Sequence, residues 1–138
     1  MTLTFEPTAL EKQAALFQQE PTVERYFQTF NQGDFLATAG LFSEAGQLLP
    51  PFEEPIVGRD AIHTYLKHEA DGMEATPKEL LVELLTGDRK QVTVKGSVKA
   101  IIFKVNAAWL FTLNAQGKID QVQVKLLASL QELLTLRP

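Results

Sequence analysis

The chain has 138 residues, of which 45% are hydrophobic and 22% charged, with a formal net charge of −4 and no cysteine. These values predict a single globular domain over 1–138, with an N-terminal arm (1–20) ahead of a core (21–138). The acidic balance and the scattered Lys and Arg residues exclude a nucleic-acid partner, and the lack of cysteine excludes disulfides and thiolate metal sites. The sequence shows no secretory signal and no apolar run of membrane-spanning length, so we expect a cytoplasmic protein.

The N-terminal arm carries a capping-box pattern. Thr8 and Glu11 have the spacing in which each side chain satisfies a free amide at a helix start, which predicts a short amphipathic helix up to about Gln19. This helix either packs on its own domain or forms a mobile arm that covers an entrance or binds a partner.

A second helix is predicted from Pro21, because proline is tolerated at the first helical position. Its apolar residues fall on one broad face, and Tyr26 is among them, next to Phe27. A buried tyrosine hydroxyl needs an acceptor, either a backbone carbonyl or an atom within a cavity. Asp34 is expected to cap a third helix that extends to Phe42.

A proline-rich segment over 50–58 must be extended, because each residue before a proline is disfavoured in the helical region. The segment leads from a short strand at 45–49 into a helix that begins after Gly58 and includes Leu66. His63 and His68 lie about 140° apart on that helix, too far for one metal ion, so we predict no metal site.

The rest of the chain alternates apolar and polar residues, as a half-buried antiparallel sheet does. The strands are predicted at 79–86, 91–103, 106–113 and 121–126. The alternation places Ile102 on the buried face. It breaks at Ile101 and Phe103, where the solvent-facing row turns apolar and indicates an interface. Ser129 and Glu132 form another capping box, which predicts a C-terminal helix.

The 106–113 strand contains the only tryptophan, Trp109, and is apolar on both faces. A strand that is apolar on both faces is expected at the centre of the fold, with a packed layer on one face and room for a ligand on the other. The indole N–H needs a partner when it is buried. It either bonds a backbone carbonyl within the core, or points into a hydrophobic cavity and holds the polar end of a long apolar ligand. The alternation does not decide between these two.

Helices followed by a long antiparallel sheet predict an α+β fold, in which helices pack on the concave face of a curved sheet and enclose a conical pocket. This arrangement resembles the nuclear transport factor 2-like superfamily. Enzymes of that type, such as those similar to ketosteroid isomerase, need an inward carboxylate as the base and a second acidic group or a tyrosine as the oxyanion donor. Among the acidic residues, only Asp120 falls in the alternating row of apolar residues of the last strand, so it is the one candidate base. We predict no catalytic site, with an isomerase or cyclase as the alternative.

Several motifs together resemble the C-terminal domain of the cyanobacterial orange carotenoid proteins and its stand-alone homologues. The resemblance covers about residues 20–136. It rests on Thr22-Val-Glu-Arg-Tyr26-Phe, Asn31-Gln-Gly-Asp34-Phe35, Leu41-Phe42, Pro50-Pro51-Phe52, Pro55-Ile56-Val57-Gly58, Ala108-Trp109-Leu-Phe111 and Leu126-Leu127-Ala128-Ser129.

The resemblance implies a non-covalently bound ketocarotenoid, canthaxanthin or echinenone, whose keto oxygen accepts hydrogen bonds from Tyr26 and Trp109. It also implies an apolar lining around the ring, for which we expect Phe27, Phe52, Leu66, Ile102, Phe111 and Val124.

The implied function is a carotenoid carrier with a photoprotective, singlet-oxygen-quenching role. The carrier would contact membranes transiently to load pigment, in the cytoplasm or in association with the thylakoid membrane, and would pass pigment to carotenoid-accepting helical-domain proteins. Some stand-alone homologues carry a cysteine near Phe103 that links dimers. This chain excludes the covalent link, and we expect a homodimer that shares one pigment through an apolar patch at Ile101 and Phe103. A protein-interaction module without ligand is the remaining alternative.

Overall fold

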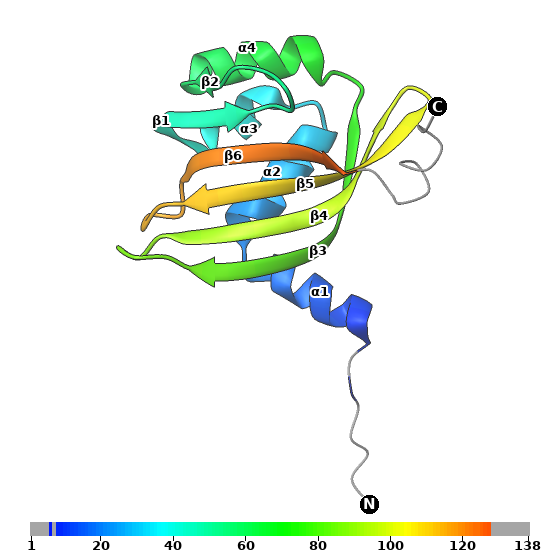
Figure 1. The fold of residues 1–138 in the computed structure, drawn as a ribbon, viewed down its shortest axis with the longest axis vertical. Coiled ribbons are helices and arrows are strands. Elements are labelled where there is room, and N and C mark those ends of the chain that lie inside the picture. Colours follow the sequence, from blue (N-terminus) through cyan, green and yellow to red (C-terminus); the bar gives the residue numbers. More distant parts are fainter. Residues whose placement is uncertain (1–5, 7, 128–138) are drawn as a thin grey trace, which may run out of the picture.

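The computed structural model describes residue 6 and residues 8–127, which form one curved sheet with helices on its concave side (Figure 1). The helices are α1 (Ala9–Gln18), α2 (Pro21–Asn31), α3 (Phe35–Gly40) and α4 (Arg59–Glu69). The strands are β1 (Phe42–Leu49), β2 (Ile56–Val57), β3 (Glu74–Leu84), β4 (Lys90–Ala100), β5 (Phe103–Leu113) and β6 (Ile119–Leu127). The predicted α+β architecture is confirmed; the predicted C-terminal helix lies outside the described residues.

The six strands are ordered β2-β1-β6-β5-β4-β3, with β5 near the centre, as its two apolar faces predict. Every pairing is antiparallel except one: β1 runs parallel to β6. The sheet is therefore mixed, and the prediction of a purely antiparallel sheet is wrong at this point. Strands β1 and β6 are far apart in the sequence and share no hairpin, so the intervening chain acts as the crossover that a parallel pair requires.

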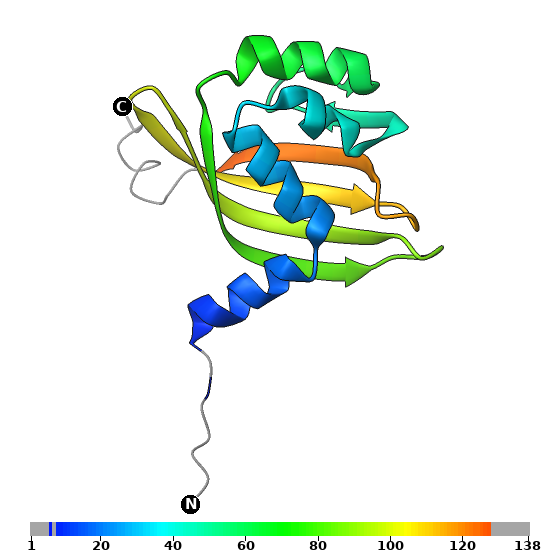
Figure 2. The same cartoon turned by 180° about the vertical axis from the view of Figure 1, so that it is seen from behind.

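The predicted helix starts are confirmed. The Thr8 hydroxyl accepts a hydrogen bond from the Glu11 amide at 3.1 Å, and the Asp34 carboxylate accepts one from Ala37 at 3.2 Å. Helix α2 begins at Pro21 and crosses the concave face of the sheet (Figure 2). Helix α4 follows Gly58, whose φ of 93° is a conformation that favours glycine.

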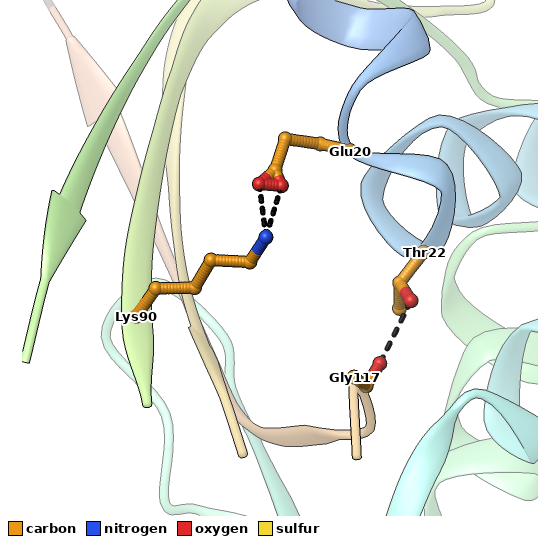
Figure 3. A network of polar contacts seen from close by, with 4 residues as sticks. All are labelled: Glu20, Thr22, Lys90 and Gly117. Carbon is orange, nitrogen blue, oxygen red and sulfur yellow. Dashed lines mark hydrogen bonds and ion pairs between the residues drawn. The ribbon is translucent and has the colours of Figure 1, made fainter. Parts of the chain in front are cut away.

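Helix α2 is attached to the sheet near both of its ends. At its start, the Glu20 carboxylate forms an ion pair with Lys90 of β4, at 2.6 Å from its Oε2 atom, and the Thr22 hydroxyl donates to the Gly117 carbonyl at 2.7 Å (Figure 3). At its end, the Asn31 side chain bonds both the amide and the carbonyl of Ala75, at 2.7 and 2.8 Å. These contacts fix how α2 lies over the sheet, and therefore where its buried side chains point.

The N-terminal helix α1 packs against its own domain, which favours the first of the two alternatives for the arm. It contacts α2 and the edge strand β3, and the Gln13 side chain accepts a hydrogen bond from the Leu80 amide at 3.0 Å. An edge strand has unpaired backbone groups, and this contact satisfies one of them.

Several strand boundaries differ from the prediction, and three of the differences have a clear cause or consequence. Strand β1 begins at Phe42, a residue that we placed on the third helix. Strand β3 begins at Glu74 and continues through Pro77, because a register shift there removes the need for the missing proline amide. Strand β4 ends at Ala100, which pairs with Phe103 across a tight turn. The long strand predicted over 91–103 is therefore the first arm of a hairpin.

Candidate ligand-binding cavity

A cavity of about 440 Å³ opens between the helices and the sheet at one end of the molecule. Its walls come from α2, α4, the strands β1, β4, β5 and β6, and the proline-rich loop after β1. The wall is mostly apolar, and it suits a ligand of the same character. Some residues on the wall were not predicted from the sequence to line a cavity; they include Pro50, Pro51, Met73, Val98 and Val105.

Tyr26 and Trp109 both line this cavity and are nearly inaccessible, with exposed fractions of 2% and 3%. Tyr26 belongs to the buried face of α2, and Trp109 lies on β5 between Val94 and Val124 of the neighbouring strands. The Phe27 ring contacts both: its centroid is 5.4 Å from that of Tyr26 and 4.9 Å from that of Trp109, nearly perpendicular to each. Edge-to-face contacts of this kind hold the two rings in fixed orientations on the same side of the cavity.

Neither the Tyr26 hydroxyl nor the Trp109 indole N–H has a hydrogen-bond partner among the described residues. In the same part of the chain, no fully enclosed polar side-chain atom lacks a partner, so these two groups open onto the cavity. Burial raises the pKa of Tyr26 well above its ordinary value, so the phenol keeps its proton at neutral pH. The cavity therefore offers two neutral donors to an acceptor atom brought in by a ligand.

The cavity mouth combines bare apolar groups with one polar contact. Phe52 in the proline-rich loop is 96% exposed, and Ile101 at the hairpin turn is 90% exposed; both have a positive φ, 61° and 54°. The Tyr65 hydroxyl of α4 donates to the Glu53 carboxylate and ties the loop to the helix. Burial, followed by this hydrogen bond, raises the pKa of Tyr65.

The structure divides the six residues expected to line the cavity into three groups. Phe52, Leu66 and Val124 lie on its wall. Phe27 and Phe111 are buried in the core behind it, where they support the Tyr26 ring. The placement of Ile102 was wrong: it is 82% exposed, because β4 ends two residues earlier and the turn carries it out of the alternation.

The candidate base Asp120 does not line the cavity. Its carboxylate accepts a hydrogen bond from the Ser43 hydroxyl at 2.8 Å and one from the Asn114 amide at 3.4 Å. The prediction assumed that buried and exposed residues alternate regularly along the last strand. A register shift in the pairing of β5 with β6 breaks this alternation next to Asp120. Among the described residues, Glu69 is the only carboxylate on the cavity wall, and no group of three or more potential metal ligands is found.

The SnoaL-like domain model matches residues 23–122. This range covers most of α2, all of α3, α4 and the strands β1 to β5, and the first part of β6. The chain belongs to the SnoaL-like family. This family has the nuclear transport factor 2-like fold, so the resemblance of the predicted architecture to that superfamily is confirmed.

Two relatives named orange carotenoid-binding protein confirm the second resemblance. The one from Synechocystis sp. is 36% identical over 117 residues, covering 82% of this chain and 37% of the relative; the one from Limnospira maxima is 35% identical, covering 83% and 38%. The solved orange carotenoid protein of Anabaena (Nostoc) sp. PCC 7120, which binds canthaxanthin, superposes with a TM-score of 0.77 at 40% identity, covering 85% of this chain and 38% of that one. The chain thus spans little more than a third of the length of these relatives.

The same fold also occurs in enzymes. The epoxide hydrolase/cyclase-like enzyme SalBIII has a TM-score of 0.64 at 24% identity, which shows the fold alone. Within the part of the chain that the structure describes, no helix is long and apolar enough to cross a membrane.

Proposed function

We propose that this SnoaL-like chain is a carrier, and not an enzyme, that binds a ketocarotenoid such as canthaxanthin or echinenone without a covalent bond. The observation that carries the proposal is the pair of neutral donors, Tyr26 and Trp109, that have no partner among the described residues and line an apolar cavity. The relationship to proteins named for carotenoid binding supports the choice of ligand.

One keto oxygen has two lone pairs and can accept both hydrogen bonds, each of which contributes about 1 kcal/mol. The apolar wall strengthens both bonds, because no water competes for the oxygen. Hydrogen bonding at the keto group also draws electron density along the conjugated chain, so we expect the absorption of the bound pigment to shift to longer wavelength. In this arrangement the phenol and the indole hold the ring end of the pigment.

The cavity encloses only part of such a pigment. A domain of this length has a radius of gyration of roughly 14 Å, comparable with half the length of a carotenoid. Leaving the remaining polyene in water costs about 25 cal/mol for each Å² of apolar surface. We therefore propose that two copies share one pigment through the exposed patch at Ile101 and Phe103, each copy holding one ring.

We extend the proposal to the route of the pigment. A bare apolar mouth suits transient contact with a membrane during loading, in the cytoplasm or at a thylakoid surface, and later transfer to a helical-domain acceptor. The role would be photoprotective, because a protein that holds a carotenoid also holds a quencher of singlet oxygen.

The test is to load the purified protein with canthaxanthin and compare it with β-carotene, which lacks the keto groups. We expect canthaxanthin to bind more tightly and to absorb at longer wavelength than it does in solvent. Tyr26→Phe and Trp109→Phe should each weaken binding about fivefold, the equivalent of one hydrogen bond of about 1 kcal/mol.

Tyr65→Phe is the matched control. It also removes a tyrosine hydroxyl from the cavity wall, but that hydroxyl is already hydrogen-bonded to Glu53 and is not free to hold a ligand. It should change affinity for canthaxanthin far less than Tyr26→Phe does. Equal affinity for the two pigments, or equal effects of the two tyrosine variants, would contradict the assigned contacts. A protein that takes up neither pigment would leave the interaction module as the better account.

A further inference from the structure

Met73 lies in the turn between α4 and β3, on the wall of the cavity that Tyr26 and Trp109 also line. Its backbone amide donates to the Ala70 carbonyl at 3.0 Å, and this contact fixes the turn beside the cavity. The Met73 side chain is half-buried and packs against the core. The chain has two methionines and no cysteine, so Met73 is the only sulfur-containing residue in the part of the chain that the structure describes.

A second pocket, of about 360 Å³, lies where this turn passes the C-terminal end of α2 (Figure 2). Unlike the cavity, it is lined by several polar side chains, those of Asn31, Gln32, Asp71 and Glu74. Met73 and Phe30 line both the second pocket and the apolar cavity, so they form the partition between the two. A small polar molecule in the second pocket therefore reaches Met73 without passing the cavity mouth, even when an apolar ligand fills the cavity.

The thioether of a methionine reacts with two-electron oxidants such as hydrogen peroxide. The sulfur donates an electron pair to one peroxide oxygen, the O–O bond breaks, and the second oxygen leaves as water. The sulfur loses two electrons and the peroxide gains them, so the reaction needs no further reactant. The product, methionine sulfoxide, is a polar and chiral group in place of an apolar and flexible one.

We propose that Met73 is an oxidation site that controls how tightly the cavity holds its apolar ligand. The sulfoxide places a strong dipole in an apolar wall, and a bound pigment covers that dipole without offering it a hydrogen bond, which weakens binding. This inference deepens the proposed function, since it rests on the carotenoid carrier and adds its regulation. The pigment is held under reducing conditions and released under oxidising ones. Methionine sulfoxide reductases restore the thioether, and with it the affinity.

The test is to treat the canthaxanthin-loaded protein with hydrogen peroxide. Mass spectrometry follows the peptide that contains Met73, and absorption follows the pigment that stays bound. We expect the peptide to gain one oxygen while the pigment is in place, and the affinity for canthaxanthin then to fall about tenfold, as expected for a polar group covered without a partner. Treatment with methionine sulfoxide reductases should restore both the mass and the affinity.

Two substitutions at the same position separate oxidation of Met73 from other effects of peroxide. Met73→Leu removes the sulfur at nearly constant volume, and its affinity for canthaxanthin should be the same before and after peroxide. Met73→Gln imitates the sulfoxide, and it should bind about tenfold more weakly than the wild type without any peroxide. Leu36→Gln places the same polar group on an exposed part of α3 and should leave binding unchanged.

Three results would each overturn the proposal. The first is a Met73 thioether that resists peroxide until the protein unfolds. The second is a sulfoxide at Met73 that leaves the affinity for canthaxanthin unchanged. The third is a Met73→Leu protein that loses its pigment in peroxide as the wild type does, because the loss would then come from another group.

The dye anilinonaphthalene sulfonate, which binds apolar protein surface, separates this inference from the proposed function. Its fluorescence with the pigment-free protein should fall when Met73 is oxidised, and should not fall in Met73→Leu. Such a fall in a protein that takes up no canthaxanthin would reject the carrier function and leave the oxidation site standing. Normal uptake of canthaxanthin that the sulfoxide does not change would reject the oxidation site alone.

Discussion

The two ends of the sheet are built in opposite ways. At the closed end, where α2 begins, polar groups meet polar groups: Glu20 is buried against Lys90, and Thr22 bonds Gly117 (Figure 3). At the open end, Phe52 and Ile101 remain in solvent beside an apolar cavity. Stability is therefore expected to depend on the closed end, and binding on the open end. A protein that must admit an apolar ligand cannot close both ends around its core.

Glu20→Ala should have the largest effect on stability. It leaves the Lys90 ammonium without its partner and removes a contact that holds the start of α2. Because the Lys90 side chain is 33% exposed and regains some hydration, we expect a loss of about 2 kcal/mol, less than for a fully buried pair. Urea unfolding measures this loss. Glu44→Ala, an exposed carboxylate on β1, is the control and should change stability by less than about 0.5 kcal/mol.

Thr22→Val should cost about 1 kcal/mol, because it leaves the Gly117 carbonyl without its hydroxyl donor at a partly buried site. The same urea experiment applies. If Glu20→Ala and Thr22→Val were both neutral, the closed end would not be the stabilising end.

Ile101→Asn should leave the protein as stable or more stable, by up to about 1 kcal/mol, although it removes a large apolar side chain. Ile101 is exposed and has a φ of 54°, a region that β-branched residues disfavour and asparagine tolerates. The same variant should weaken self-association. A clear loss of stability in the monomer would show that this turn supports the fold and is not a free contact surface.

Tyr26→Phe should have the smallest effect at neutral pH, within about 0.5 kcal/mol, because the hydroxyl has no partner in the described structure to lose. The difference should appear in alkali. Burial raises the pKa of Tyr26 above its ordinary value of 10.0, so the folded state keeps a proton that the unfolded state releases, and stability falls as pH rises above that value. The variant should lose less stability over that range.

Spectrophotometric titration of the two tyrosines gives an independent check, because the pKa of Tyr65 is raised as well. We expect no tyrosinate signal near pH 10.0 in the folded protein, and a signal only when alkali unfolds it. A residue that titrated normally in the folded state would not be in the desolvated environment described for it.

The helices and the central place of Trp109 could be predicted from sequence because their signals are local. Capping residues such as Thr8, proline at a helix start and a one-face apolar pattern all act within a few residues. Tyr26 and Trp109, on separate elements, were brought together only by the resemblance to a known family.

The errors come from features that local pattern cannot encode. Ile102 is not on the buried face as predicted, because a tight turn follows Ala100 and ends the alternation of buried and exposed residues. Asp120 does not face the cavity, because a register shift in the pairing of β5 with β6 reverses which residues face inward there. A one-residue shift moves a side chain to the opposite face of a sheet, so a single irregularity is enough to misplace a candidate base. The parallel pairing of β1 with β6 depends on strands far apart in the sequence and has no local signal.

The most direct test of the central claim is the visible absorption spectrum of the canthaxanthin-loaded protein, for the wild type, Tyr26→Phe, Trp109→Phe and the double variant. If both groups donate to one keto oxygen, each single variant should move the absorption part of the way towards that of the free pigment, and the double variant should move it furthest. Spectra that are the same in all four proteins would contradict the account, because the pigment would then contact neither ring.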